Sequence, residues 1–296
     1  MAQTAWVGPT AREHLAASGS WLLHSVFARG ANLVRLGAGP SGAPPMLHLS
    51  ARPEPLAGKG SLAVPFGVEL DGATWGRWRR ALRAIPGSAR WRFDAAQGTL
   101  LAPGAAGIAL PLLPGRPSGA AAPGAVPSAA GSSGAAPASP SAPGAPPADE
   151  LVEALAAAEG DEQTGCAAAA AGILRGDAAP ARELIGRGIG LTPSGDDALV
   201  GMMALAPASA PAHRAVAEVA ELIRTRGRRL TTDVSCAYLV DASRHRFAGP
   251  LQAVLDARPG PELDRALEGL LAVGHSSGAD TLQGLRSMAR ARRRAA

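Results

Sequence analysis

A glycine-rich segment in the C-terminal half holds residue types suited to binding an anion. It reads Gly186-Arg187-Gly188-Ile189-Gly190-Leu191-Thr192-Pro193-Ser194-Gly195-Asp196-Asp197 and leads into the apolar stretch 198–205. Alternating glycines permit positive φ, so successive N–H groups can turn toward a phosphate or carboxylate at a helix start. Thr192 before Pro193 predicts an N-cap followed by proline in the first helical position. The predicted substrate-binding residues here are Gly188, Gly190, Thr192, Ser194 and Gly195.

Two consecutive aspartates complicate this anion site. Asp196 and Asp197 fall in or just after the first helical turn, where the helix dipole favours negative charge. They would repel a bound phosphate unless a cation, an arginine or a proton intervened. Either Mg²⁺ bridges them to substrate or they act as polar anchors and proton acceptors. A capped glycine-rich turn without a ligand explains the same residues, and the segment has neither Rossmann nor P-loop spacing.

A second polar segment, Gly274-His275-Ser276-Ser277-Gly278-Ala279-Asp280, separates two apolar helical stretches. Ser276 or Ser277 can cap the second helix, and His275 can exchange protons near neutral pH. A serine activated by His275 is conceivable, although sequence neighbours rarely have that geometry, and a structural hydrogen bond is the plainer role for this histidine. Ser277, Gly278 and Asp280 are predicted to bind substrate.

A third polar segment, Thr231-Thr232-Asp233-Val234-Ser235, also reads as a helix start. If the three helices pack side by side, their N-termini converge on one electropositive pocket. We therefore predict Asp196, Asp197 and His275 as catalytic residues, with Thr231 and Thr232 joining the binding set. Arg244 and Arg246 follow closely and can add a guanidinium fork, or can simply be solvated.

The elements that must position these residues differ between the two halves of the chain. Residues 1–113 break into short apolar runs between Gly and Pro, which indicates a β-rich region. Residues 114–148 are almost wholly Pro, Ala, Gly and Ser, which predicts a disordered linker or surface loop. Residues 149–296 show helical spacing. The predicted fold class is α+β, with the β-rich half packed against the helical half.

The composition limits the classes of partner and the cellular location that we expect for the protein. The net charge of +5 comes from scattered arginines, with one dense cluster at the C-terminus, so we expect no nucleic-acid partner. Two distant cysteines, Cys166 and Cys236, argue against a disulfide framework or a zinc cluster. The sequence has neither a signal-like N-terminus nor an apolar stretch of ~20 residues, so we expect no membrane association and a cytoplasmic protein.

Four ordered motifs resemble the AllH family. They are residues 190–197, the Thr231-Thr232 pair with Ser235, Arg246-Phe247 before Pro250-Leu251, and residues 274–280. The resemblance covers residues 184–285 well and the N-terminal half only loosely, through 25–27 and 31–33. Ile189, Ala198 and Ser276 depart from the family pattern without removing a charge or a glycine, and the 114–148 insertion departs further.

The resemblance implies one subunit of a multi-subunit oxamate carbamoyltransferase of allantoin breakdown. That enzyme interconverts oxalurate and phosphate with oxamate and carbamoyl phosphate, so its substrates are small anions. We therefore expect a carbamoyltransferase subunit with further subunits as partners and no cofactor. Two alternatives are a non-catalytic subunit that senses an anion, and a phosphate-chemistry enzyme with Mg²⁺ held by Asp196, Asp197 and Asp280.

Overall fold

The structure is a computed structural model, and it describes nine stretches of the chain. These are residues 4–16, 18–37, 43–52, 62–84, 89–96, 98–101, 109–111, 149–158 and 164–296. The Pro/Ala/Gly/Ser insertion predicted at 114–148 lies outside the described residues. The domain boundaries next to it therefore stay predictions.

The N-terminal half forms one eight-stranded sheet within the described residues. The strand order is β1-β5-β4-β3-β2-β6-β7-β8, and every neighbouring pair is antiparallel except β4 and β5, which are parallel. The strands are β1 (Thr4–Val7), β2 (Gly19–Val26), β3 (Gly30–Arg35), β4 (Met46–Ala51), β5 (Gly67–Leu70), β6 (Arg90–Asp94), β7 (Thr99–Leu101) and β8 (Ala109–Pro111). Helices α1 (Pro9–His14) and α2 (Gly72–Ala84) accompany the sheet.

Large aromatic side chains form the core between this sheet and α2. Trp75, Trp78 and Leu82 recur at helical spacing and are buried, and Trp78 stacks on Trp91 of β6 with ring centroids 6.4 Å apart. Strand β6 alternates buried and exposed side chains because only one of its faces meets the core. The predicted β-rich half is thus confirmed, although α2 was not separated from the strands by the sequence pattern.

The C-terminal half is helical, as predicted. Its helices are α3 (Asp149–Ala157), α4 (Thr164–Arg175), α5 (Ala179–Arg182), α6 (Ser194–Leu205), α7 (Ala210–Leu230), α8 (Asp233–Ala242), α9 (Gly249–Asp256), α10 (Pro261–Leu271) and α11 (Ser277–Ala295). Leu230 ends α7 and is 40% exposed. No helix in the described part of the chain is long and apolar enough to cross a membrane.

Helix α6 lies at the centre of this half and packs most extensively on α11. Every residue of α6 after Ser194 is buried. Two glycines bring the helix backbones into contact: a Cβ on Gly201 would lie 2.1 Å from the Thr281 carbonyl oxygen, and one on Gly284 would lie 1.9 Å from that of Ala198. Because no side chain fits between them, the relative placement of α6 and α11 is set by the backbone.

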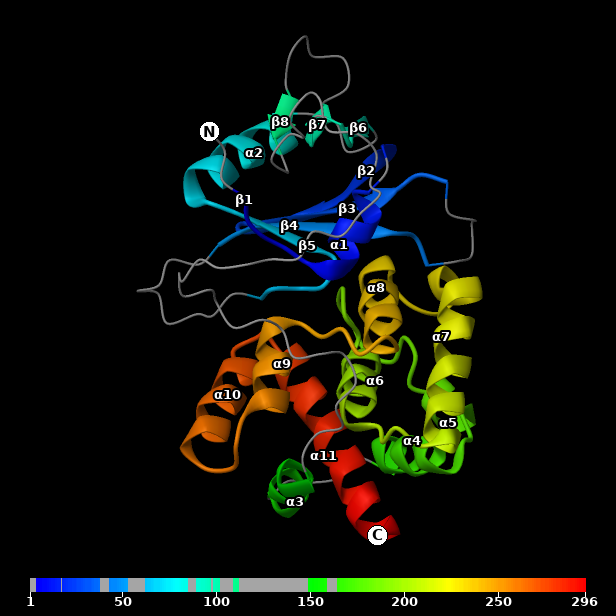
Figure 1. The fold of residues 1–296 in the computed structure, drawn as a ribbon. Helices are drawn as coiled ribbons and strands as arrows, with labels where there is room; N and C mark the ends of the chain where they lie inside the picture. The colour runs from blue at the N-terminus through cyan, green and yellow to red at the C-terminus, as the bar shows by residue number, and fades with distance from the viewer. Residues whose placement is uncertain are drawn as a thin grey trace, which may run out of the picture.

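The two halves meet through α8, which faces the sheet (Figure 1). Tyr238 of α8 packs edge-on against Phe66, with ring centroids 5.0 Å apart. The Thr10 hydroxyl donates to a carboxyl oxygen of buried Asp241 at 2.7 Å. Arg246 completes the junction by donating to Thr10 at 2.9 Å and to Glu13 at 2.5 Å. These contacts hold the sheet beside α8 and the segment that leads into α9.

Candidate functional site

The starts of α6, α8 and α11 come together, as the sequence suggested. The hydroxyl oxygens of Thr192 and Ser277 are 2.8 Å apart and join the segment before α6 to the start of α11. The Thr232 hydroxyl donates to the Leu191 carbonyl at 2.5 Å, and the Thr231 hydroxyl donates to Asp196. Residues from positions 192, 196, 231, 232 and 277 thus form one polar cluster.

The glycine-rich loop is held close to neighbouring backbone. Gly186, Gly188 and Gly190 have φ of 73°, 114° and 99°, a region that other residues rarely adopt. A Cβ on Gly186 would lie 2.0 Å from the Leu230 carbonyl oxygen, and one on Gly195 would lie 2.0 Å from that of Leu184. The glycines therefore serve tight packing as well as loop shape.

Local hydrogen bonds use several of the backbone N–H groups that were predicted to bind an anion. The Gly195 N–H donates to the Arg187 carbonyl at 2.9 Å, and the N–H groups of Asp196 and Asp197 donate to the Pro193 carbonyl. These three donors are used within the chain. Helix α6 begins at Ser194 with Pro193 in the N-cap position, one residue later than predicted, and this leaves the Thr192 hydroxyl free to meet Ser277.

Asp196 is buried and fully engaged in local structure. It is 2% exposed; one carboxyl oxygen accepts from the Gly186 N–H at 2.9 Å and the other from the Thr231 hydroxyl. Burial raises its pKa above the ordinary range, while hydrogen bonds from Thr231, Gly186 and Ser235 oppose the rise. This carboxyl group ties the glycine loop to the start of α8.

Asp197 is also buried but keeps a carboxyl oxygen without a partner. It is 7% exposed, and its Oδ2 has no hydrogen bond among the described residues. Burial raises the pKa of Asp197 to about 7; Ser277 and Thr192 hydroxyls lower it, and the charges of Asp280 and Asp196 raise it. A carboxyl group with this pKa can both accept and return a proton near neutral pH.

Asp197 lines a small pocket between α6, α8, α9 and α11. The pocket has a volume of about 100 Å³, and Thr192, Ser277, Tyr238 and Arg246 share its walls with Asp197. It can hold a small polar group such as an amide, but not a large substrate. Arg246, suggested by the sequence as a possible guanidinium fork, reaches this pocket while bound to Thr10 and Glu13. We call this space the inner pocket.

Several predicted residues lie at the margin of this cluster. His275 is exposed and makes no hydrogen bond with Ser276 or Ser277 in the described structure, so the two serines lack the partner that a histidine-activated nucleophile needs. Ser276 takes the N-cap position of α11 without a side-chain cap bond. Gly190 is exposed, and a Cβ there would meet open space.

The remaining predicted residues pack against neighbouring backbone, cap a helix or lie in its first turn. Ser194 opens α6 against Gly188, whose added Cβ would lie 2.7 Å from the Ser194 nitrogen. Gly278 packs on the Leu270 carbonyl oxygen, 1.9 Å from an added Cβ. Thr232 caps α8 by accepting from the Ser235 N–H at 3.0 Å. Asp280 lies in the first turn of α11, and its Oδ2 is buried without a hydrogen bond among the described residues.

The three carboxylates suggested as magnesium ligands do not converge. No group of three His, Cys, Asp or Glu side chains among the described residues could hold a metal ion. Asp196 directs its oxygens to Gly186 and Thr231, away from such a role. Cys166 and Cys236 are both buried and do not form a disulfide with each other. The geometry therefore lends no support to a metal site built from Asp196, Asp197 and Asp280.

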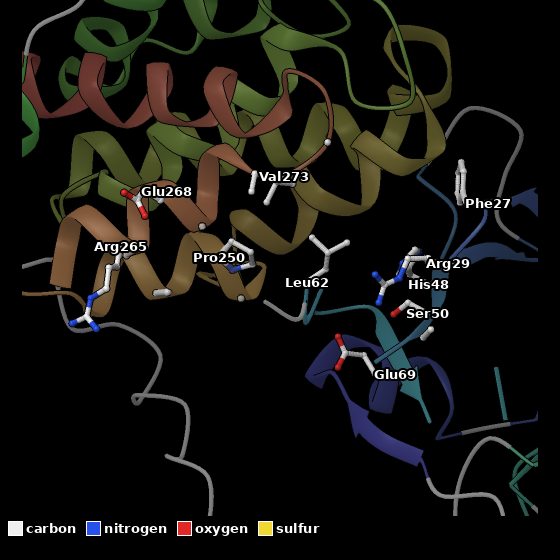
Figure 2. A pocket seen from close by; sticks show the side chains of 18 residues that line it. Phe27, Arg29, His48, Ser50, Leu62, Glu69, Pro250, Arg265, Glu268 and Val273 are labelled. Atoms are coloured by element: carbon white, nitrogen blue, oxygen red, sulfur yellow. The ribbon is translucent and has the colours of Figure 1, made fainter. Parts of the chain in front are cut away.

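A wider cleft of about 660 Å³ adjoins the inner pocket and was not anticipated from the sequence. It lies between the sheet and helices α9 and α10 (Figure 2), and it shares Leu62, Pro250 and Val273 with the inner pocket. Arg29 and His48 line its sheet wall. Neither Arg29 nor His48 belongs to one of the polar segments identified in the sequence, so residue spacing could not link them to the glycine-rich loop.

A family model described as oxamate carbamoyltransferase subunit AllH matches residues 184–289. The match begins just before the glycine loop and ends within α11, so it spans all three helix starts of the polar cluster. No solved structure matches the chain. The family match agrees with the resemblance seen in the four motifs, and the family is described as a subunit of an oxamate carbamoyltransferase.

Proposed function

We propose that this chain is the subunit of a carbamoyltransferase that carries out proton transfer at the reacting nitrogen of a small anionic substrate. The single observation that carries the proposal is the unpartnered oxygen of buried Asp197 in a pocket of amide size. The AllH match over the same residues supplies the reaction class. A role in allantoin or purine breakdown and a cytoplasmic location belong to the same proposal.

The proposed reaction needs one proton acceptor. The amide nitrogen of the acceptor attacks the carbonyl carbon of carbamoyl phosphate and a C–N bond forms. The C–O bond to phosphate breaks, and its electron pair leaves with the phosphate group. The proton lost by nitrogen passes to the Asp197 carboxylate, so atoms and charge balance. In the reverse direction, protonated Asp197 returns the proton to the departing amide nitrogen.

The surroundings of Asp197 suit this role better than those of His275. Burial brings the pKa of Asp197 to about 7, close to the value at which a group exchanges protons most effectively under neutral conditions. The hydroxyls of Thr192 and Ser277 stand beside it and can orient the carbonyl oxygen of a bound amide. His275 is exposed, which leaves it to contact solvent or a partner subunit.

The test is Asp197→Asn, assayed in the complex with the subunits that co-purify with the chain. Asparagine keeps the size of the side chain but cannot accept the proton, so we expect turnover to fall by about 10²- to 10⁴-fold. The matched control is Asp264→Asn on the exposed face of α10, which should leave turnover unchanged. Near-normal turnover of the Asp197→Asn complex would overturn the proposal.

Thermal-shift measurements separate this function from its two alternatives. Stabilisation by carbamoyl phosphate or oxamate without metal is expected for a carbamoyltransferase subunit, and equally for a non-catalytic subunit that senses an anion. Stabilisation that requires Mg²⁺ would favour the phosphate-chemistry alternative. The turnover of the Asp197→Asn complex then distinguishes the catalytic subunit from the sensor.

A further inference from the structure

The wide cleft has two walls of different character. Its helical wall is mostly apolar, with Pro250 and Val273, but also carries the charged pair Arg265 and Glu268 on α10. Leu62 lies between this wall and the sheet. Its sheet wall is polar and carries Arg29, His48, Ser50 and Glu69, as Figure 2 shows. A ligand that fills the cleft therefore needs an apolar stretch as well as polar groups.

His48 presents a hydrogen-bond acceptor on the sheet wall. The Asn32 side chain donates its N–H to the Ser25 hydroxyl at 3.1 Å, so its oxygen faces His48 Nδ1 at 2.7 Å. Nδ1 must then carry the proton, and Nε2 keeps its lone pair. Burial lowers the pKa of His48 to about 4, so the ring is neutral at physiological pH. Nε2 has no partner among the described residues and can accept from a ligand N–H.

Arg29 supplies a cation on the same wall. Its side chain is exposed, and it forms no ion pair or hydrogen bond within the described part of the chain. The backbone at Arg29 is fixed, since its carbonyl accepts from the Ala51 N–H at 3.0 Å. A guanidinium group can bind a carboxylate through two parallel N–H donors. The sheet wall thus offers a cation for an anionic group and an acceptor for an N–H donor.

The size of the cleft bears on the length of the ligand. Its volume of about 660 Å³ falls in the range of ~300–1,000 Å³ that is common for pockets binding drug-sized ligands. Oxamate has only two carbons and would leave most of this space to water. Because the cleft and the inner pocket share Leu62, Pro250 and Val273, a longer molecule can extend from one to the other.

We infer that the cleft binds an acceptor substrate longer than oxamate, an amide or ureido compound that also carries a carboxylate. Its carboxylate meets Arg29, an N–H group donates to His48 Nε2, and its reacting amide passes Leu62 toward Asp197. The last of these contacts rests on the proposed function. The N-terminal sheet then selects the substrate, and the polar cluster of the helical half reacts with it.

Calorimetric titration of the full chain with succinamate tests the inference without turnover. Succinamate carries an amide and a carboxylate, and its neutral counterpart succinamide lacks the charge. We expect saturable binding of succinamate by the unaltered chain and binding of succinamide that is at least tenfold weaker. Arg29→Gln should weaken succinamate binding about tenfold and abolish its advantage over succinamide.

Two matched controls and a blocking variant complete the experiment. Arg92→Gln changes an exposed arginine on β6 outside the cleft and should leave binding unchanged. Gly269→Leu fills the cleft from α10, where an added Cβ meets open space, and leucine favours the helix, so the variant should fold but lose binding. Asp264→Leu, on the same helix outside the cleft, is its control.

The outcomes separate this inference from the proposed function. Failure of the unaltered chain to bind succinamate, or equal binding by Arg29→Gln, overturns the cleft as a carboxylate site even if Asp197→Asn abolishes turnover. Conversely, an Asp197→Asn complex with normal turnover overturns the proposed function, while loss of binding in Arg29→Gln and Gly269→Leu would still identify the cleft as the binding site.

Discussion

The first turn of α6 has two polar sides that differ in how completely their groups are paired. Toward α8, Asp196 accepts hydrogen bonds at both oxygens, from Gly186 and Thr231. Toward α11, Asp197 keeps Oδ2 unpaired and lines the inner pocket. We call the Asp196 side, where both carboxyl oxygens are paired, the closed side, and the Asp197 side the open side. The closed side stabilises the loop, and the open side leaves a proton acceptor for a ligand.

The open side should be most sensitive to pH. Because the folded state raises the pKa of Asp197 from near 4 to about 7, the folded chain binds this proton more tightly than the unfolded chain. The stabilisation that the folded chain gains from this tighter proton binding is therefore complete below about pH 4, and it is lost as the pH rises to about 7. Relative to Asp197→Asn, the free energy of unfolding of the unaltered chain should fall by up to ~4 kcal/mol across this window.

Urea denaturation of both chains at several pH values between 4 and 8 measures this difference. Taking the difference between the two chains removes the contribution of other titrating groups, among them Asp241, whose pKa burial raises to about 6. If the difference in the free energy of unfolding between the two chains stayed constant with pH, Asp197 would titrate normally. The contrast between the two sides of α6 would then disappear.

The closed side should contribute more to stability at constant pH. Asp196→Ala leaves the Gly186 N–H and the Thr231 hydroxyl without their acceptor, so we expect a loss of about 3 kcal/mol in the free energy of unfolding. Asp197→Ala should cost about 1 kcal/mol or less at pH 7, because it also removes a buried and under-paired charge. Equal losses in urea denaturation would show that both carboxyl groups are structural.

Two threonine substitutions make a finer version of the same comparison. Thr231→Val keeps the side-chain shape but deprives Asp196 of a donor, which should cost about 2 kcal/mol. Thr192→Val breaks the contact with Ser277 beside the open pocket and should cost about 1 kcal/mol. Thermal unfolding of the two variants gives the order, and a larger loss for Thr192→Val would contradict the assignment of closed and open sides.

Much of this arrangement could be predicted because its signals are local in the sequence. Helical spacing in residues 149–296 and short apolar runs before residue 113 gave the α+β class, and the polar segments before α6, α8 and α11 marked three helix starts that do meet. Capping chemistry explains why such starts are recognisable: Ser, Thr and Asp are favoured there for hydrogen bonds within a few residues.

The rest depended on contacts that spacing does not encode. Nothing in the pair Asp196-Asp197 shows which carboxyl group would find two donors, because Thr231 lies 35 residues away. The same holds for the cleft, where Arg29 and His48 face α9 and α10 only after the sheet docks on the helices. The anion site expected from the loop N–H groups differs for a local reason, because the Gly195 N–H donates to the Arg187 carbonyl instead of facing a ligand.

The backbone contact between α6 and α11 bears on how substrate preference can evolve. With Gly201 and Gly284 pressed against opposing carbonyl groups, the distance between Asp197 and Ser277 cannot be adjusted by exchanging side chains at the helix crossing. The sheet wall is different, since Phe27 and Arg29 are exposed and can be replaced without disturbing a helix crossing. Divergence toward new acceptors should therefore accumulate in the N-terminal half, while the reacting centre changes little.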